Sequence, residues 1–138
     1  MDHRSKNKLS EEFSQPRTPG RFAYSGLERI MHERARLSIL SSLATHPEGL
    51  LFNDLKAVCS LTDGNLSRQL TALQEAGLVD VVKGVRNNRP TTLCRLSASG
   101  KKRFLEYVSE LERVVADASV ATREPARKSV FPQGFLPT

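Results

Sequence analysis

The sequence predicts a mainly α-helical domain that carries one small β-hairpin and ends in a long C-terminal helix. Three observations lead to this prediction. Apolar residues recur at steps of three and four in several segments, as the buried face of a helix requires. Two β-rich runs, residues 78–84 and 91–96, are separated by turn-forming residues. A final apolar seam continues over residues 104–118 in alternating steps of four and three.

Length and composition set the domain boundaries that we expect. The chain has 138 residues, the size of one domain, but its apolar share of 38% lies below the usual ~45–50%. Part of the length therefore lies outside the core. Residues 1–21 are polar and net basic and contain two prolines, so they predict a disordered or irregular basic arm. Residues 22–118 form the expected domain, and the proline-containing residues 119–138 predict an irregular tail.

Three helices are expected before the hairpin. The first spans Tyr24–Thr45, where apolar residues repeat at helical spacing until a His-Pro pair prevents continuation. The second spans Phe52–Cys59. The third has Thr62 or Asp63 as its N-cap and runs to Ala76, where a glycine follows as the C-terminal stop.

The hairpin is expected to have a long basic loop. Residues 78–84 alternate and contain several valines, and residues 91–96 are likewise rich in β-formers. The segment between them, GVRNNRP at 84–90, contains glycine, asparagine and proline, which all favour turns. We therefore expect two short strands joined by a loop that carries two arginines.

The basic charge of the chain is concentrated in one window. The formal net charge is +6, and residues 83–103 contain seven lysines and arginines with no aspartate or glutamate. This window therefore accounts for the whole excess. A surface that binds a polyanion needs such a block of unneutralised cations. The alternative is a solvated charged face, which normally mixes both signs.

The order of three helices, basic hairpin and long helix is that of a winged helix-turn-helix. Residues 36–84 resemble the winged helix-turn-helix of bacterial and archaeal transcription regulators and are similar to the MarR-like and ArsR-like group. Within them, LTDGNLSRQLTALQEAGLVDVVKG is similar to the recognition helix and first wing strand. TTLCRLSASGKKRF resembles the second wing strand and the start of the last helix. The resemblance covers roughly residues 24–108 and implies a DNA-binding regulator.

The third helix has one apolar side and one side suited to a DNA groove. Leu66, Leu70 and Leu73 lie within about 60° of one another at 100° per residue. On the other side, Arg68 can pair with guanine or phosphate, and Asn65 with adenine or phosphate. The alternative is an ordinary amphipathic core helix. The residues expected to contact DNA here are Thr62, Gly64, Asn65, Ser67, Arg68 and Thr71.

The hairpin is expected to act as the wing. Two arginines near a hairpin tip can reach a minor groove or the sugar-phosphate edge beside it. Solubility is the alternative role for these cations. Arg95 and Lys101–Arg103 belong to the same basic window, and contact with DNA or another orientation is equally open for them. The residues expected to contact DNA from the wing are Lys83, Arg86, Asn87, Asn88 and Arg89.

The last helix is expected to begin at Ser97 or Ser99 and to end near Ala118. Its apolar seam can pack on the first helix of the same chain or on a second copy. We favour a two-fold homodimer, because the seam extends past the body that could cover it. The residues expected at the dimer interface are Phe104, Tyr107, Val108, Leu111, Val114, Val115 and Ala118.

Catalysis, cofactors and metals are not expected. The three histidines are far apart, and no His-x-x-Glu-His or Cys-x-x-Cys pattern occurs. Cys59 and Cys94 are expected as small core residues, and so few cysteines fit a reducing cytosol. No apolar run of 18 residues predicts a membrane span, and the first residues lack the apolar stretch of a secretory signal.

Together these observations predict a cytoplasmic, homodimeric, sequence-specific DNA-binding transcription regulator. Residues 62–76 would lie in the major groove of double-stranded DNA, and residues 83–90 on the minor groove or backbone. One alternative is a winged-helix module for protein–protein interaction. The other is a sensor switched by a small effector, for which no polar cluster in the sequence identifies the ligand.

Overall fold

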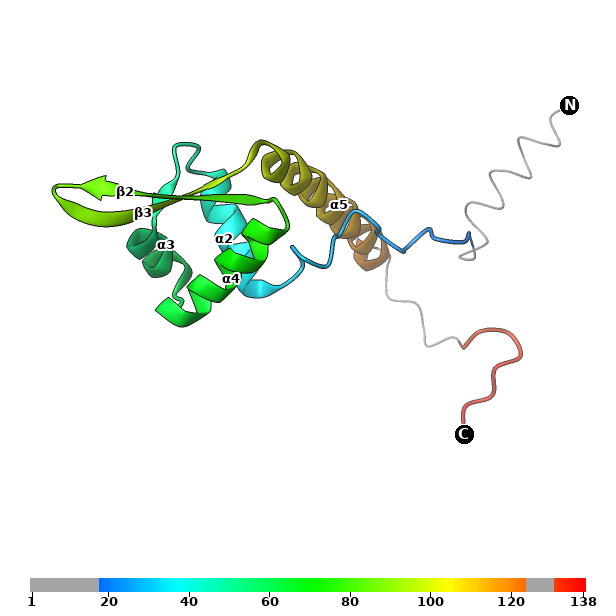
Figure 1. Cartoon of the computed structure of the whole chain (residues 1–138). Coiled ribbons are helices and arrows are strands. Elements are labelled where there is room, and N and C mark those ends of the chain that lie inside the picture. The colour runs from blue at the N-terminus through cyan, green and yellow to red at the C-terminus, as the bar shows by residue number, and fades with distance from the viewer. Residues whose placement is uncertain (1–17, 124–130) are drawn as a thin grey trace, which may run out of the picture.

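The computed structural model describes residues 18–123 and 131–138. Helices α2 (Arg34–Ala44), α3 (Phe52–Cys59) and α4 (Asp63–Glu75) pack together beneath a small sheet. The hairpin of that sheet extends from one side of the helical cluster, and the long helix α5 leaves from the opposite side (Figure 1). The predicted second and third helices are confirmed, because α3 and α4 have the expected bounds to within a residue.

The sheet has three antiparallel strands in the order β1-β3-β2. Strands β2 (Val79–Arg86) and β3 (Arg89–Leu96) form the predicted hairpin, and β1 (Leu50–Leu51) pairs with β3. The sequence did not predict β1, since two residues are too few to show an alternating pattern.

The prediction of a long loop at the hairpin tip is wrong. The pairing of β2 with β3 continues to Arg86 opposite Arg89, which leaves only Asn87 and Asn88 in the turn. Their φ angles are 52° and 62°, in the left-handed region that asparagine tolerates better than most residues. A two-residue turn of this kind matches the twist of the strands, so the wing is a continuous β-ribbon with both arginines at its end.

The predicted first helix is wrong over its first ten positions. Residues 24–33 form successive turns, and α2 begins only at Arg34, where the carboxylate of Glu33 accepts hydrogen bonds from two backbone amides. The turns bond residues three or four apart, for example Met31 N–H to the carbonyl of Glu28. Such turns place apolar side chains at helical spacing, so periodicity alone does not distinguish them from a helix.

The hydrophobic core lies between the three helices, the sheet and the first half of α5 (Ala98–Arg123). Phe104 and Tyr107 belong to this core, with exposed fractions of 6% and 0%. Their prediction as dimer contacts is therefore wrong, because their own chain already covers them. Val108 and Leu111 are half-buried against the same core.

Helix α5 is longer than expected and begins at a tight junction. Ser97 caps it by accepting a hydrogen bond from the Gly100 amide at 2.9 Å, and the helix continues past Ala118 to Arg123. Residues 119–123 are thus helical rather than part of an irregular tail.

Residues 131–138 contain neither helix nor strand, and the remainder of the predicted arm and tail lies outside the described residues. In the parts of the chain that the structure describes, no helix has the length and apolarity of a membrane span.

Candidate nucleic-acid interface

Helix α4 presents the polar side that the sequence predicts. Leu66, Leu70 and Leu73 face the core, whereas Gly64, Ser67, Arg68 and Thr71 are exposed. The Thr62 hydroxyl accepts a hydrogen bond from the Asn65 amide at 3.1 Å and so caps the helix.

Asn65 is more committed to the fold than expected. It is half-buried, and its side-chain oxygen accepts a hydrogen bond from Gln69 at 3.2 Å. Gln69 in turn accepts a bond from Arg36 of α2 at 2.9 Å. The Asn65–Gln69 spacing of four residues is a signal that the sequence does contain, but the Arg36 partner is not local. These two hydrogen bonds hold the side of α4 that borders α2.

The charges on α4 favour an anionic partner at its exposed side. Within the described ranges, Arg68 has neither an ion-pair partner nor a side-chain hydrogen bond. The acidic residue of the first turn, Asp63, is paired with Lys56 of α3 at 2.8 Å. A helix N-terminus also carries partial positive charge from its unbonded amides.

The wing carries cations that the fold does not use. Arg86, Asn87, Asn88 and Arg89 form the end of the hairpin and are all exposed. The hairpin itself projects away from the helices (Figure 1). Lys83, three residues before Arg86 in β2, is also exposed. Among the residues that the structure describes, none of these three basic side chains forms an ion pair. A protruding ribbon with uncompensated positive charge attracts a polyanion.

A cleft brings α4 and the wing together. Its volume is about 300 Å³, and it is lined by Ser67 and Thr71 from α4 and by Lys83 and Thr92 from the hairpin. Phe52, Leu70, Gln74 and Val81 complete the lining. The polar residues of the cleft are thus one lysine, three residues with hydroxyl groups and one amide. These are the groups that bind the phosphates and sugars of a nucleic-acid backbone.

The structure divides the basic window between two places. Four of its residues lie on the hairpin strands β2 and β3, whereas three lie on the first turns of α5. The first group is Lys83, Arg86, Arg89 and Arg95, and the second is Lys101, Lys102 and Arg103. Arg103 is used inside the fold, since it donates to the carboxylate of Glu28 and to the carbonyl of Ala76. The open question about Arg103 is therefore answered in favour of a structural contact.

The cysteines are consistent with the expected core role. Cys94 is buried, and burial raises the pKa of its thiol to about 11. Cys59 is half-buried at the end of α3, with its sulfur 3.4 Å from the hydroxyl of Ser42. The described segments contain no group of three or more metal-ligating side chains.

The sequence model of one family, the winged helix DNA-binding domain, matches residues 35–115. The chain belongs to this family. The match spans the core helices, the sheet and most of α5, so the predicted winged helix-turn-helix fold is confirmed.

Relatives of this winged-helix protein include transcription regulators. A Methanocaldococcus jannaschii protein of uncharacterised function, MJ0432, is 35% identical over 83 residues, which are 60% of this chain and 89% of that one. The structure of a transcriptional regulator homologue from Pyrococcus horikoshii matches with a TM-score of 0.60 and 28% identity, covering 64% of this chain and 87% of that one.

Two further solved structures share the fold. NadR in complex with 4-hydroxyphenylacetate matches with a TM-score of 0.55 and 26% identity over 86% of this chain and 77% of that one. The Staphylococcus aureus MepR–DNA complex matches with a TM-score of 0.59 and 20% identity over 85% of this chain and 90% of that one. The predicted resemblance to winged helix-turn-helix transcription regulators is confirmed, because the family is a winged helix DNA-binding domain and the Pyrococcus horikoshii relative is a transcriptional regulator homologue.

Proposed function

We propose that this winged-helix protein regulates transcription by binding duplex DNA as a homodimer, with α4 in the major groove and the wing on the adjacent minor groove or backbone. The observation that carries the proposal is the position of four unpaired cations. Within the described residues, Arg68, Lys83, Arg86 and Arg89 lack ion-pair partners. They lie on the exposed side of α4 and on the wing, and Lys83 lines the cleft between these two elements.

Each element has a distinct role in this arrangement. Arg68 reads a guanine edge or grips a phosphate, and the amide nitrogen of Asn65 is still available to donate to DNA. Ser67 and Thr71 offer hydroxyl oxygens, and Arg86 and Arg89 extend along the duplex. The wing contacts supply affinity without sequence preference, whereas the α4 contacts supply the preference. A protein of this fold, MepR, was solved with DNA, which supports the proposed partner.

The salt dependence of binding tests this proposal against the alternative of a protein-interaction module. Duplexes selected from a random library should yield one enriched sequence. Affinity for that sequence should fall linearly with the logarithm of salt concentration, because phosphate contacts release counterions. A library without enrichment, or binding that salt does not weaken, would contradict DNA reading.

The homodimer is supported by the outer half of α5. Val115 is 62% exposed, Ala118 is also exposed, and both continue the seam beyond the part that the core covers. Val114, on the same seam, is half-buried. A second copy related by a two-fold axis would bury this stripe on both chains and would place two α4 helices on a palindromic site.

Sedimentation of the unmodified protein and of two variants tests the homodimer. Val115→Asp with Ala118→Asp should give a folded monomer, because the substitutions put like charges across the axis. Val120→Asp is the control. Val120 is 65% exposed, but it points about 140° around the helix from Val115, so this variant should remain a dimer. A monomeric unmodified protein at tens of micromolar would contradict the homodimer.

A second candidate function, control by a small carboxylate, is favoured by one pocket. A cavity of about 150 Å³ lies between α2, the end of β3 and α5, with Leu43, Leu96 and Phe104 in its wall and Lys101 at its side. An engineered apolar cavity of about this volume holds one benzene ring. NadR was solved with 4-hydroxyphenylacetate. That compound should raise the melting temperature of this protein, but not of a Lys101→Ala variant; equal melting temperatures with and without it would exclude the candidate.

A further inference from the structure

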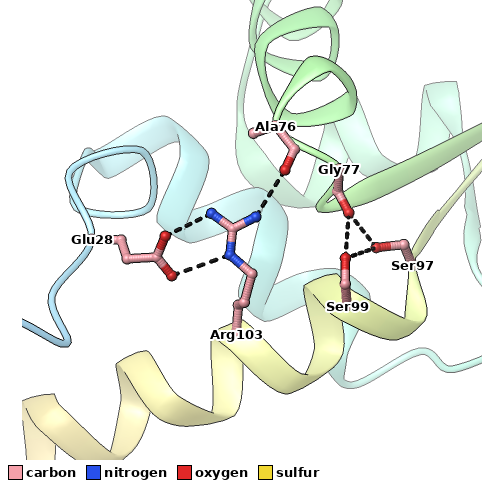
Figure 2. A network of polar contacts seen from close by, with 6 residues as sticks. All are labelled: Glu28, Ala76, Gly77, Ser97, Ser99 and Arg103. Atoms are coloured by element: carbon pink, nitrogen blue, oxygen red, sulfur yellow. Dashed lines mark hydrogen bonds and ion pairs between the residues drawn. The ribbon is translucent and has the colours of Figure 1, made fainter.

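The end of the reading helix is bonded directly to α5. Arg103, in the second turn of α5, donates through Nη1 to the carbonyl of Ala76 at 2.8 Å, and Ala76 is the C-cap of α4 (Figure 2). Ser97 and Ser99 both donate their hydroxyls to the carbonyl of Gly77, the next residue. We call the contacts of Ala76 and Gly77 with α5 and the two serines the α4–α5 junction.

The other edge of the Arg103 guanidinium bonds Glu28, which lies outside both α4 and α5. Nη2 and Nε donate to the two carboxylate oxygens of Glu28, at 2.6 Å and 3.2 Å. Glu28 belongs to the turns that precede α2. Arg103 therefore lies between two acceptors, Glu28 on one side and the end of α4 on the other (Figure 2).

The chemistry of this position requires arginine. The last carbonyls of a helix lack intrahelical partners and form the negative end of its dipole, so a cation there is stabilised. The planar guanidinium bonds a carboxylate with two parallel N–H groups and keeps another N–H for the carbonyl. A lysine ammonium is a point charge on a flexible chain and cannot hold both partners in one fixed plane.

The backbone of the junction is equally constrained. A side chain on Gly100 would collide with the carbonyl group of Leu78, so α5 packs directly on the chain that leaves α4. The Ser97 amide also donates to the Leu78 carbonyl at 3.0 Å. These contacts hold Leu78, which follows α4, close to the start of α5, whereas Arg103 bonds the C-cap of α4 itself.

We infer that Arg103 is a positioning residue for DNA reading, which fixes the angle of α4 on α5 and thereby the separation of the two reading helices in the homodimer. This inference rests on the proposed function. In a dimer joined through α5, the path from one α4 to the other passes through two α4–α5 junctions. A looser junction lets α4 adopt more orientations, so half-sites at incorrect separations are bound with a smaller loss.

Half-site spacing is the measurement that tests this role. The selected palindrome is compared with duplexes in which one base pair is added or removed at its centre, which changes the separation by about 3.4 Å and the rotation by about 35°. The unmodified protein should prefer its own spacing by about tenfold or more. Arg103→Lys should lower that preference at least about fivefold, the lower end of typical coupling between sites.

Two further variants separate positioning from charge and from stability. Arg95→Ala removes another arginine of the same basic window, which has no bonded partner in the described residues, and should leave the preference unchanged. Glu28→Gln keeps the Ala76 contact but weakens the hold on Arg103, so it should lower the preference by less than Arg103→Lys. If circular dichroism shows that Arg103→Lys does not fold, Glu28→Gln alone tests the positioning role.

The possible results are distinct. If the folded Arg103 and Glu28 variants keep the spacing preference of the unmodified protein, the positioning role is overturned. The same holds if these variants lose affinity equally for all spacings and for a single half-site, since that marks a phosphate contact or general destabilisation. If the unmodified protein selects no sequence or sediments as a monomer, the proposed function itself fails.

Discussion

The two ends of the molecule use arginine in opposite ways. Along α5, Arg21 is paired with Asp117 at 2.8 Å, Arg103 with Glu28 at 2.6 Å, and Arg113 with Glu110 at 3.6 Å. On the wing, at the other end, Arg86 and Arg89 have no such partner among the described residues. The two ends differ in what surrounds each cation, not in the type of cation.

This difference separates cations that the fold uses from cations that it leaves free to bind an anion. The paired arginines hold the turns of residues 18–33 along α5, although exposed ion pairs of this kind add little to the stability of a fold. The unpaired arginines contribute nothing comparable to the fold, so their positive charge remains available for phosphate. A count of basic residues in a window does not reveal this distinction, because it includes both kinds.

The largest expected effect concerns two glycines, Gly100 in the first turn of α5 and Gly64 in the first turn of α4. Gly100→Ala places a methyl group against the Leu78 carbonyl and should lower the free energy of unfolding by about 1–3 kcal/mol or more. Gly64, on the exposed side of α4, has no atom within 4 Å of an added Cβ. Gly64→Ala should therefore raise that free energy by about 0.5–1 kcal/mol. Urea denaturation measures both, and equal changes would show that the α4–α5 junction is not tightly packed.

The next effect concerns sequence reading by Arg68, the unpaired arginine on α4. Arg68→Ala should weaken binding to the selected duplex by about 1–3 kcal/mol if Arg68 reads a guanine. Binding to random duplex should weaken less, because a base contact is lost only where the base is present. Competition titrations with both duplexes give the ratio. Equal losses would assign Arg68 to a phosphate.

The smallest effect concerns the paired end under acid. Hydrogen bonds from Arg21 and Tyr24 hold the pKa of Asp117 at about 2, below its ordinary value of 3.8. Arg103 likewise lowers the pKa of Glu28. Because the folded state binds these protons less tightly than the unfolded state, the stabilisation is complete above pH ~4–5 and is lost towards pH 2. Asp117→Asn should lower the melting temperature much more at pH 7 than at pH 2, and a constant difference would contradict the contact.

Local patterns in the sequence predicted α3, α4 and the two long strands. The signals for these elements are helical periodicity, the Thr62 cap and β-branched alternation. Each acts over a few residues, so the structure of the segment follows from its own sequence. The same locality explains the errors. Turns over residues 24–33 repeat at the spacing of a helix, and the Asn87–Asn88 pair forms a turn shorter than the flanking glycine and proline indicate.

The sequence predicted which residues could form the candidate site. It did not predict which basic and apolar residues the fold itself uses. Exposure confirms that Arg68, Arg86 and Arg89 are accessible, as a DNA contact requires. Arg103 belongs to the same basic run, but its partner Glu28 is 75 residues away and the Ala76 carbonyl is 27 residues away. Tyr107 follows the seam of α5 and yet is buried by its own chain. Only the tertiary structure separates these residues from their neighbours.

The contrast between the two ends is tested most directly by the salt dependence of DNA binding in two matched variants. Each loses two arginines: Arg86 and Arg89 become alanine in one, Arg21 and Arg113 in the other. The wing variant should reduce the slope of log affinity against log salt by about 2, since each phosphate contact contributes about 0.9. The α5 variant, once shown to be folded, should keep the slope of the unmodified protein. An unchanged slope in the wing variant, or equal reductions in both, would contradict the assignment of the wing as the DNA-binding end.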